Sequence, residues 1–321
     1  MFNDLPLDAL HAVQPQSVEP ADFEGFWAAT LAESRAATRP ATVTAVDVGL
    51  RTVEVFDVRF AGFGGQPIAA WLILPRGMTP EVTVVQYQGY SLGRGFPAEN
   101  LIWSSAGHAL LLVDSRGQGW NPHHGNGATP DIATMPPQPP GLMLRGIDSP
   151  GNHYYRRLLT DAVLAVDFVR SYEPLRETRV VVHGVSQGGG ISLAVAGLVE
   201  GLAGVLPDVP FLCDYRRAVA VTDAYPYREI SDYLQGYRDR VEETFATLAY
   251  FDGTSFAARA TAPALFSVAL MDETCPPSTV FAAYNVYAAA KDIAVYAYNG
   301  HEGGGPYQHA RQLAFLDALR G

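Results

Sequence analysis

The sequence is poor in cysteine, in basic residues and in long apolar runs, and each shortage excludes a class of protein. Two cysteines, Cys213 and Cys275, are too few for the disulfide framework of a small secreted domain, so we expect free thiols and a cytoplasmic protein. Lysine and arginine number 22 against 33 acidic residues, and the net charge of −11 argues against nucleic acid or an anionic membrane surface as a partner. No run of 18 apolar residues occurs, so no membrane span is expected.

What the sequence does contain is an alternation of strand and helix patterns. The chain has 321 residues, of which 48% are hydrophobic and 17% charged, as in ordinary globular proteins. Short β-branched runs predict strands at 82–86, 109–113, 180–182, 219–221, 264–268 and 293–296. Helical patterns predict helices at 98–106, 153–172, 188–200, 278–290 and 307–320. This alternation predicts an α/β protein with a mostly parallel central sheet flanked by helices, in one domain over residues 1–321.

Four further segments do not fit the simple alternation. Residues 1–40 predict an N-terminal extension with a docked helix after Pro20, and residues 42–74 predict a β-hairpin that turns at Gly64-Gly65. Residues 117–151 are rich in proline and glycine, while residues 223–261 are rich in tyrosine and predict helices. Both segments are read as insertions, and so long a loop as 117–151 is usually a lid or an oligomer contact.

The segment Gly184-Val-Ser186-Gln-Gly188 matches the nucleophile elbow pattern G-x-S-x-G. Three valines before it predict a strand, and the apolar run after it predicts a helix. A sharp strand-to-helix turn places the serine in a strained conformation with its hydroxyl exposed, and the residues flanking it are crowded unless they are glycine. Because strand and helix both flank the pentapeptide, we interpret Ser186 as a candidate nucleophile rather than a helix-capping serine.

Candidate partners for Ser186 follow two later strands. An elbow serine needs a carboxylate and then a histidine in chain order, and Asp272 and His301 come just after the predicted strands 264–268 and 293–296. In this arrangement His301 accepts the serine proton, while Asp272 orients the imidazole. Glu273, one residue further into the same loop, is an alternative to Asp272. An oxyanion hole would combine the backbone N–H groups of Gln187 and Tyr90.

The sequence gives no sign of a cofactor or a metal site. No pair of histidines has metal-ligand spacing with a carboxylate on a shared helix, so we expect neither. The chemistry that remains is acyl transfer through a serine.

Three motifs together resemble the signatures of carbohydrate esterase family seven: Asp114-Ser-Arg116-Gly-Gln118-Gly, Gly184-Val-Ser186-Gln-Gly188-Gly and Gly300-His301-Glu302. The similarity continues in Phe211-Leu-Cys-Asp214, in Asp272-Glu-Thr-Cys-Pro-Pro-Ser-Thr279 and in the N-terminal Pro20-Ala-Asp-Phe-Glu-Gly-Phe-Trp27. It extends essentially from end to end of the chain. The departures are mild: Ser115 stands where a valine is more usual, and the segment 121–147 is unusually rich in proline.

The resemblance implies an α/β-hydrolase fold with Ser186, Asp272 and His301 as the catalytic triad and Tyr90 and Gln187 as the oxyanion amides. It also implies removal of acetyl groups from acetylated xylo-oligosaccharides and cephalosporin C, and assembly into a cytoplasmic hexamer. Arg116 would then organise loops near the site.

Two other readings of the same residues stay open at this level. One is another small-acyl carboxylesterase or a thioesterase, since acyl and alcohol pockets come from loops far apart in sequence. The other is a non-catalytic binding protein with a hydrolase fold, against which the complete set of candidate residues argues.

Overall fold

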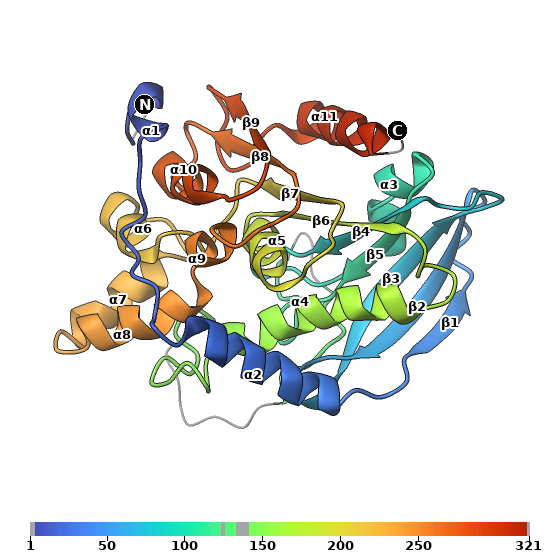
Figure 1. Ribbon diagram of the computed structural model, residues 1–321, viewed down its shortest axis with the longest axis horizontal. Helices are drawn as coiled ribbons and strands as arrows, with labels where there is room; N and C mark the ends of the chain where they lie inside the picture. The colour runs from blue at the N-terminus through green and yellow to red at the C-terminus, as the bar shows by residue number, and fades with distance from the viewer. Residues whose placement is uncertain (1–3, 123–125, 133–140, 320–321) are drawn as a thin grey trace.

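A nine-stranded sheet runs through the computed structural model of the chain, whose described residues are 4–122, 126–132 and 141–319 (Figure 1). Its strands are β1 (Thr42–Val46), β2 (Val53–Ala61), β3 (Pro67–Pro75), β4 (Val82–Tyr87), β5 (Ala109–Val113), β6 (Arg179–Val185), β7 (Gly204–Asp208), β8 (Ala264–Ala269) and β9 (Lys291–Tyr296). The spatial order is β1-β2-β3-β5-β4-β6-β7-β8-β9. Pairs from β1 to β5 are antiparallel and every pair from β5 to β9 is parallel. The mostly parallel sheet predicted from the sequence is therefore confirmed.

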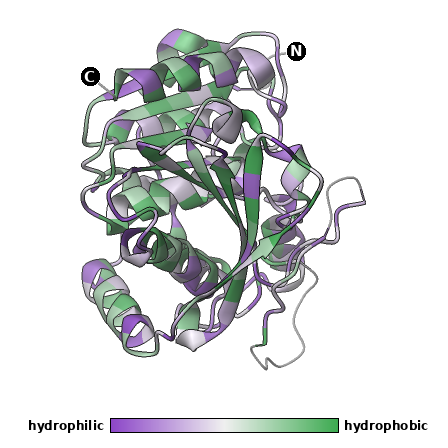
Figure 2. Ribbon diagram, turned by 90° about the vertical axis from the view of Figure 1, so that its right-hand side faces the viewer, coloured by the Kyte–Doolittle hydropathy of each residue, from purple (hydrophilic) through white to green (hydrophobic). Residues whose placement is uncertain are grey.

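Helices cover both faces of the sheet. They are α1 (Leu7–Leu10), α2 (Phe23–Ala36), α3 (Ile102–Ser105), α4 (Tyr154–Ser171), α5 (Gln187–Leu198), α6 (Tyr215–Val221), α7 (Arg228–Gly236), α8 (Val241–Leu248), α9 (Gly253–Ala257), α10 (Pro277–Val286) and α11 (Gly305–Ala318). Short 3₁₀ turns are η1 (Phe63–Gly65), η2 (Pro97–Glu99) and η3 (Ala249–Phe251). The larger core lies on the face covered by α4, α5, α9 and α10, and a smaller one joins α3 and α11 to the opposite face. In Figure 2 the strands between these layers are mostly hydrophobic, because both faces of the sheet are buried.

The N-terminal extension docks as predicted. Helix α2 lies along the outside of α4 (Figure 1), and its buried face presents Phe23, Trp27 and Leu31 to the core. The indole N–H of Trp27 donates to the Tyr250 carbonyl at 3.0 Å. The extension thus packs against the second insertion as well as against α4. The hairpin β2–β3, with Gly64-Gly65 in its connection, is also confirmed.

One predicted strand was wrong, and two strands of the sheet, β1 at its edge and β7 in its interior, were missed. Residues 219–221 form the end of α6, in which Tyr215 and Ala218, three residues apart, face the core. The sheet instead contains β7, whose Pro207 argues against a central strand because proline has no N–H to donate. Pro207 is tolerated because the pairing with β8 is made at Val205 and Asp208, on either side of it. The predicted helix 98–106 is also divided, into η2 and α3.

The two insertions differ in how far the structure describes them. The second contains α7, α8, η3 and α9, which confirms its helical character. Of the first, residues 123–125 and 133–140, including most of the proline-rich segment 136–141, lie outside the described residues. No helix in the described part of the chain is long and apolar enough to cross a membrane.

Candidate active site

Ser186 sits at the sharp turn between β6 and α5. Its φ of 58° and ψ of −118° place a non-glycine residue in the left-handed half of backbone space, which requires a surrounding structure that enforces it. A Cβ on Gly184 would lie 2.3 Å from the backbone of Gly188, and a Cβ on Gly188 would lie 2.3 Å from the Tyr87 carbonyl oxygen. Glycine is therefore required at both flanking positions. The strand–turn–helix context predicted for this segment is present.

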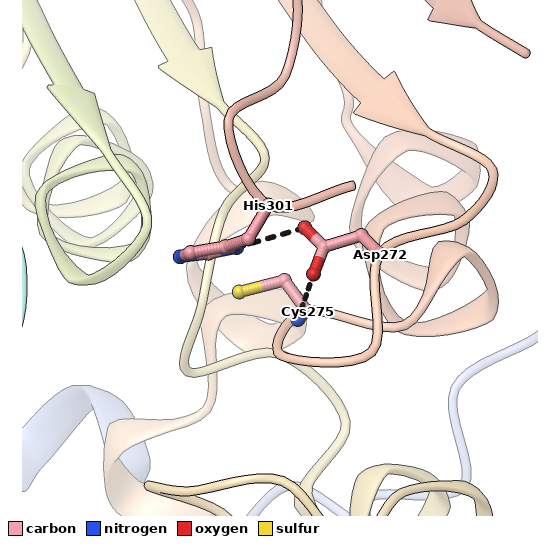
Figure 3. A group of neighbouring side chains, drawn as sticks. All are labelled: Asp272, Cys275 and His301. Atoms are coloured by element: carbon pink, nitrogen blue, oxygen red, sulfur yellow. Dashed lines mark hydrogen bonds and ion pairs between the residues drawn. The ribbon is translucent and has the colours of Figure 1, made fainter. Parts of the chain in front are cut away.

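Asp272 and His301 meet at the same edge of the sheet, from the loops that follow β8 and β9 (Figure 3). The His301 Nδ1 and the Asp272 Oδ2 are 2.8 Å apart. The other Asp272 oxygen accepts hydrogen bonds from the backbone N–H groups of Thr274 at 2.8 Å and Cys275 at 2.9 Å. The carboxylate is buried and held from both sides, while 35% of the His301 side chain is exposed. Asp272 rather than Glu273 is thus the carboxylate that contacts the imidazole.

Cys275 is a member of this cluster that the sequence analysis did not single out. Its Sγ lies 3.9 Å from the Ser186 Oγ, and ligand-type atoms of Asp272, Cys275 and His301 all lie within 4.8 Å of one another. Ser186, Asp272 and His301 are therefore brought together around the thiol. No hydrogen bond joins Ser186 to His301 directly within the described residues, and catalytic contacts of this kind often tighten only when substrate binds.

The same three residues offer the sulfur, nitrogen and oxygen ligands that zinc uses in proteins. However, the carboxylate and imidazole already bond to each other, and burial raises the pKa of the Cys275 thiol well above its usual range. The geometry fits the predicted role of Asp272 and His301 in proton transfer, and the Cys275 thiol lies beside the Ser186 hydroxyl. The sequence signals for Cys275 were its place three residues after Asp272 and its occurrence in the family-like segment Asp272–Thr279.

The two backbone N–H groups predicted for the oxyanion site come from segments that follow neighbouring strands. The Gln187 amide is the first of helix α5, and the Tyr90 amide lies in the loop after β4, the strand that pairs with β6. Among the described residues neither amide donates to an acceptor of the protein. Ser91, directly after Tyr90, has a φ of 67°, so this loop is sharply turned next to the elbow. Both predicted amides are thus available to a ligand oxygen.

Arg116 stabilises the loop that follows β5. Its guanidinium is 1% exposed and binds both oxygens of Asp161 on α4, at 2.5 and 2.6 Å, and the Gln66 side chain at 2.8 Å. A paired, fully buried arginine of this kind ties elements together. The structural role expected for Arg116 agrees with these contacts, because they join the loop to α4 and to the β2–β3 connection.

The chain matches known proteins over nearly all of its length. The sequence profile of the acetyl xylan esterase (AXE1) family matches residues 1–319. The acetyl esterase Axe7A of Xylanibacter ruminicola is 26% identical over 301 residues, which are 90% of this chain. The chain spans only 65% of the length of that relative.

Two solved structures are similar in sequence and in fold. An acetyl xylan esterase from Paenibacillus sp. R4 is 39% identical with a TM-score of 0.90, over 98% of this chain and 99% of that one. Acetyl xylan esterase 1 from a Thermoanaerobacterium species is 32% identical with a TM-score of 0.89, over 99% of both chains. The α/β-hydrolase fold expected from the sequence is confirmed.

Proposed function

The chain belongs to the acetyl xylan esterase family, and from that membership and the geometry of the site we propose that it is a serine esterase that removes acetyl groups from small acetylated substrates. The observation that carries the proposal is the strained Ser186 turn, with the Asp272–His301 pair on the adjacent loops and two backbone amides that donate to no acceptor among the described residues. A nucleophile, a base, an orienting carboxylate and an oxyanion site are the parts that acyl transfer needs.

The proposed reaction proceeds in two halves. The Ser186 Oγ attacks the ester carbonyl carbon as its proton passes to the Nε2 of His301, whose Nδ1–H is held by Asp272. The amides of Tyr90 and Gln187 hydrogen-bond the negative oxygen of the tetrahedral intermediate. The carbon–oxygen bond then breaks, and the alcohol leaves with the proton from His301. In the second half, water attacks the acetyl-enzyme as His301 accepts its proton. The bond to the Ser186 Oγ then breaks, the serine regains the proton from His301, and acetate is released.

A small acyl group suits the space beside the nucleophile. Ser186 is 7% exposed and its hydroxyl has the Cys275 sulfur 3.9 Å away, so there is little room on that side. In such pockets one extra methylene on the acyl group changes the free energy of transition-state binding by roughly 1–3 kcal/mol. We expect at least a tenfold preference in kcat/KM for acetyl over butyryl esters.

The finer properties rest on the family. We include acetylated xylo-oligosaccharides and cephalosporin C among the proposed substrates, and a homohexamer in the cytoplasm as the proposed form. The two cysteines are free and buried, which agrees with a reducing compartment. Size exclusion coupled to light scattering should give about six times the 34.6 kDa chain mass, and a monodisperse monomer at micromolar concentration would refute the assembly.

Labelling and a nucleophile variant test the proposal. A fluorophosphonate should label the wild-type protein at Ser186, and Ser186→Ala should abolish the label and lower kcat by roughly 10⁴-fold with the fold intact. A folded Ser186→Ala protein with more than a tenth of the wild-type rate would overturn the mechanism. Nitrophenyl esters from acetate to octanoate, run beside acetylated xylobiose and cephalosporin C, separate this enzyme from other carboxylesterases and from thioesterases. An unlabelled, inactive wild-type protein would instead favour a binding function.

A further inference from the structure

Glu229, near the start of α7, connects three segments that are far apart in the sequence. The Tyr90 hydroxyl donates a hydrogen bond to the Glu229 Oε1 at 2.6 Å and accepts one from the Leu142 N–H at 2.8 Å. The Met143 N–H donates to the other Glu229 oxygen at 3.1 Å. One carboxylate and one phenol thus join the candidate oxyanion loop to the described end of the first insertion and to the second insertion.

The packing around this pair leaves it little freedom. A Cβ on Gly141 would lie 2.0 Å from a Glu229 oxygen, so the chain passes the carboxylate as closely as glycine allows. The Tyr90 ring packs edge-on against the rings of Trp120 and Phe211, with centroids 6.0 and 6.4 Å away. Burial raises the pKa of Glu229, and the hydrogen bonds from the Tyr90 hydroxyl and from the Met143 N–H oppose that rise. The Tyr90 side chain is therefore held along its ring and again at its hydroxyl.

We propose that Glu229 is a positioning residue for the oxyanion site: by anchoring the Tyr90 hydroxyl it keeps the Tyr90 N–H directed at the position of the developing oxyanion. The inference rests on the proposed function, because that function assigns the Tyr90 N–H to the oxyanion site. The loop at Tyr90 has no strand or helix to fix it, and Gly89 before it adds backbone freedom. An oxyanion donor acts only if it is already oriented when charge develops. The side-chain anchor supplies that orientation.

Steady-state kinetics on p-nitrophenyl acetate test whether the Tyr90–Glu229 contact supports catalysis. The variants are Glu229→Gln, Glu229→Ala, Tyr90→Phe and the double variant Tyr90→Phe/Glu229→Ala. Removal of one oxyanion donor costs about 10²–10³ in kcat, so a donor that is loosened rather than lost should cost about tenfold. We expect Tyr90→Phe and Glu229→Ala each to lower kcat about tenfold with KM nearly unchanged. The double variant should be hardly worse than either single one, because both remove the same contact. Glu229→Gln, which can still accept the Tyr90 hydrogen bond, should retain most of the rate.

Asp232→Asn is the matched control. Asp232 lies on the same helix and carries the same charge, but its side chain is exposed and bonds to Arg228 and Tyr225 instead of the oxyanion loop. This variant should stay within about twofold of the wild type. A loss in Asp232→Asn as large as in Glu229→Ala would show a general effect of charge on α7 and overturn the proposal.

Hydrogen exchange of the peptide that spans residues 87–93 provides a readout independent of turnover. Tyr90→Phe and Glu229→Ala should speed exchange there and leave exchange in β4 unchanged. If Glu229→Ala does not fold, Tyr90→Phe, which removes a single oxygen, still decides the question. Unchanged exchange and kcat in Tyr90→Phe, or rate losses that multiply in the double variant, would refute the anchor. Faster exchange in a protein whose wild type hydrolyses no ester would support the anchor while refuting the proposed function.

Discussion

The Gln118 side chain donates a hydrogen bond to the Gln187 side chain, with 3.1 Å between its Nε2 and the Gln187 Oε1. The Gln118 Oε1 accepts a hydrogen bond from the Ser91 N–H at 2.6 Å, and the Gln118 Nε2 also donates to the Tyr154 hydroxyl at 2.9 Å. Gln118 therefore spans the gap between the residue that follows the candidate nucleophile and the loop that carries the other candidate oxyanion amide. Gln118, which belongs to the Asp114-Ser-Arg116-Gly-Gln118-Gly motif, thus holds the two sides of the site at a fixed separation.

Gln118→Met is expected to impair both stability and activity. The methionine fills the same space but leaves the partly buried Ser91 N–H without its acceptor, which costs about 1 kcal/mol of unfolding free energy. We expect kcat to fall about tenfold or more, measured beside urea unfolding. Asn121→Ala removes a contact to the Ser91 hydroxyl on the same loop and serves as the control. Equal, small effects of the two variants would contradict the bridging role.

Asp272→Asn and Glu273→Gln should differ sharply. An asparagine at 272 can present an N–H to the His301 Nδ1, which selects the wrong tautomer, and such a change costs about 10⁴-fold in kcat in serine triads. In the described part of the chain the imidazole bonds to Asp272, so the Glu273 variant should keep a rate within about threefold of the wild type. Steady-state kinetics on p-nitrophenyl acetate measure both. Comparable losses in the two variants would reopen the choice of carboxylate.

The acyl selectivity should depend on Cys275. Cys275→Ala removes the sulfur 3.9 Å from the Ser186 Oγ and opens space of about one methylene, whose burial is worth about 0.8 kcal/mol. The ratio of kcat/KM for butyrate to that for acetate should rise about fourfold. Cys213→Ala is the matched control, since Cys213 is also free and buried but has its Sγ 3.5 Å from the Phe211 carbonyl oxygen. An unchanged ratio in Cys275→Ala would show that the thiol does not line the acyl pocket.

His153 should make the protein less stable in acid. Burial lowers its pKa from 6.5 to about 4, because the ring is fully enclosed and stacks on Phe251, while the hydrogen bond to the Met143 carbonyl at 3.0 Å partly opposes that fall. The unfolded chain then binds a proton between pH 6.5 and 4 that the folded chain does not. The stability from the neutral ring is therefore complete above pH 6.5 and is lost as the pH falls to about 4, by about 3 kcal/mol.

Comparison with His153→Asn isolates this contribution. The difference in unfolding free energy between wild type and variant, measured in urea at pH 7, 5.5 and 4, should shrink as the pH falls. Other titrating groups cancel in the difference. A difference that is the same at all three pH values would show that His153 protonates equally in both states.

The local pattern of the sequence determined the elements that depend on neighbouring residues. Three valines followed by Gly184 predicted the strand and turn at Ser186, because the crowding of Gly184 against Gly188 involves residues only four apart. The positions of Asp272 and His301 after predicted strands were enough to place them at one sheet edge, since the carboxyl ends of parallel strands meet there. Their catalytic roles, and those of Tyr90 and Gln187, stay predictions.

Tertiary structure decided what depends on residues distant in the chain. The strand β7 was missed because Pro207 obscured it, and only the gap in its pairing with β8 explains why it is tolerated. Cys275 became part of the site because the fold brings it against Ser186, 89 residues earlier. Glu229 meets Tyr90 across 139 residues. No period or spacing in a sequence encodes such contacts, because they depend on where whole loops settle after the sheet has set the positions of their ends.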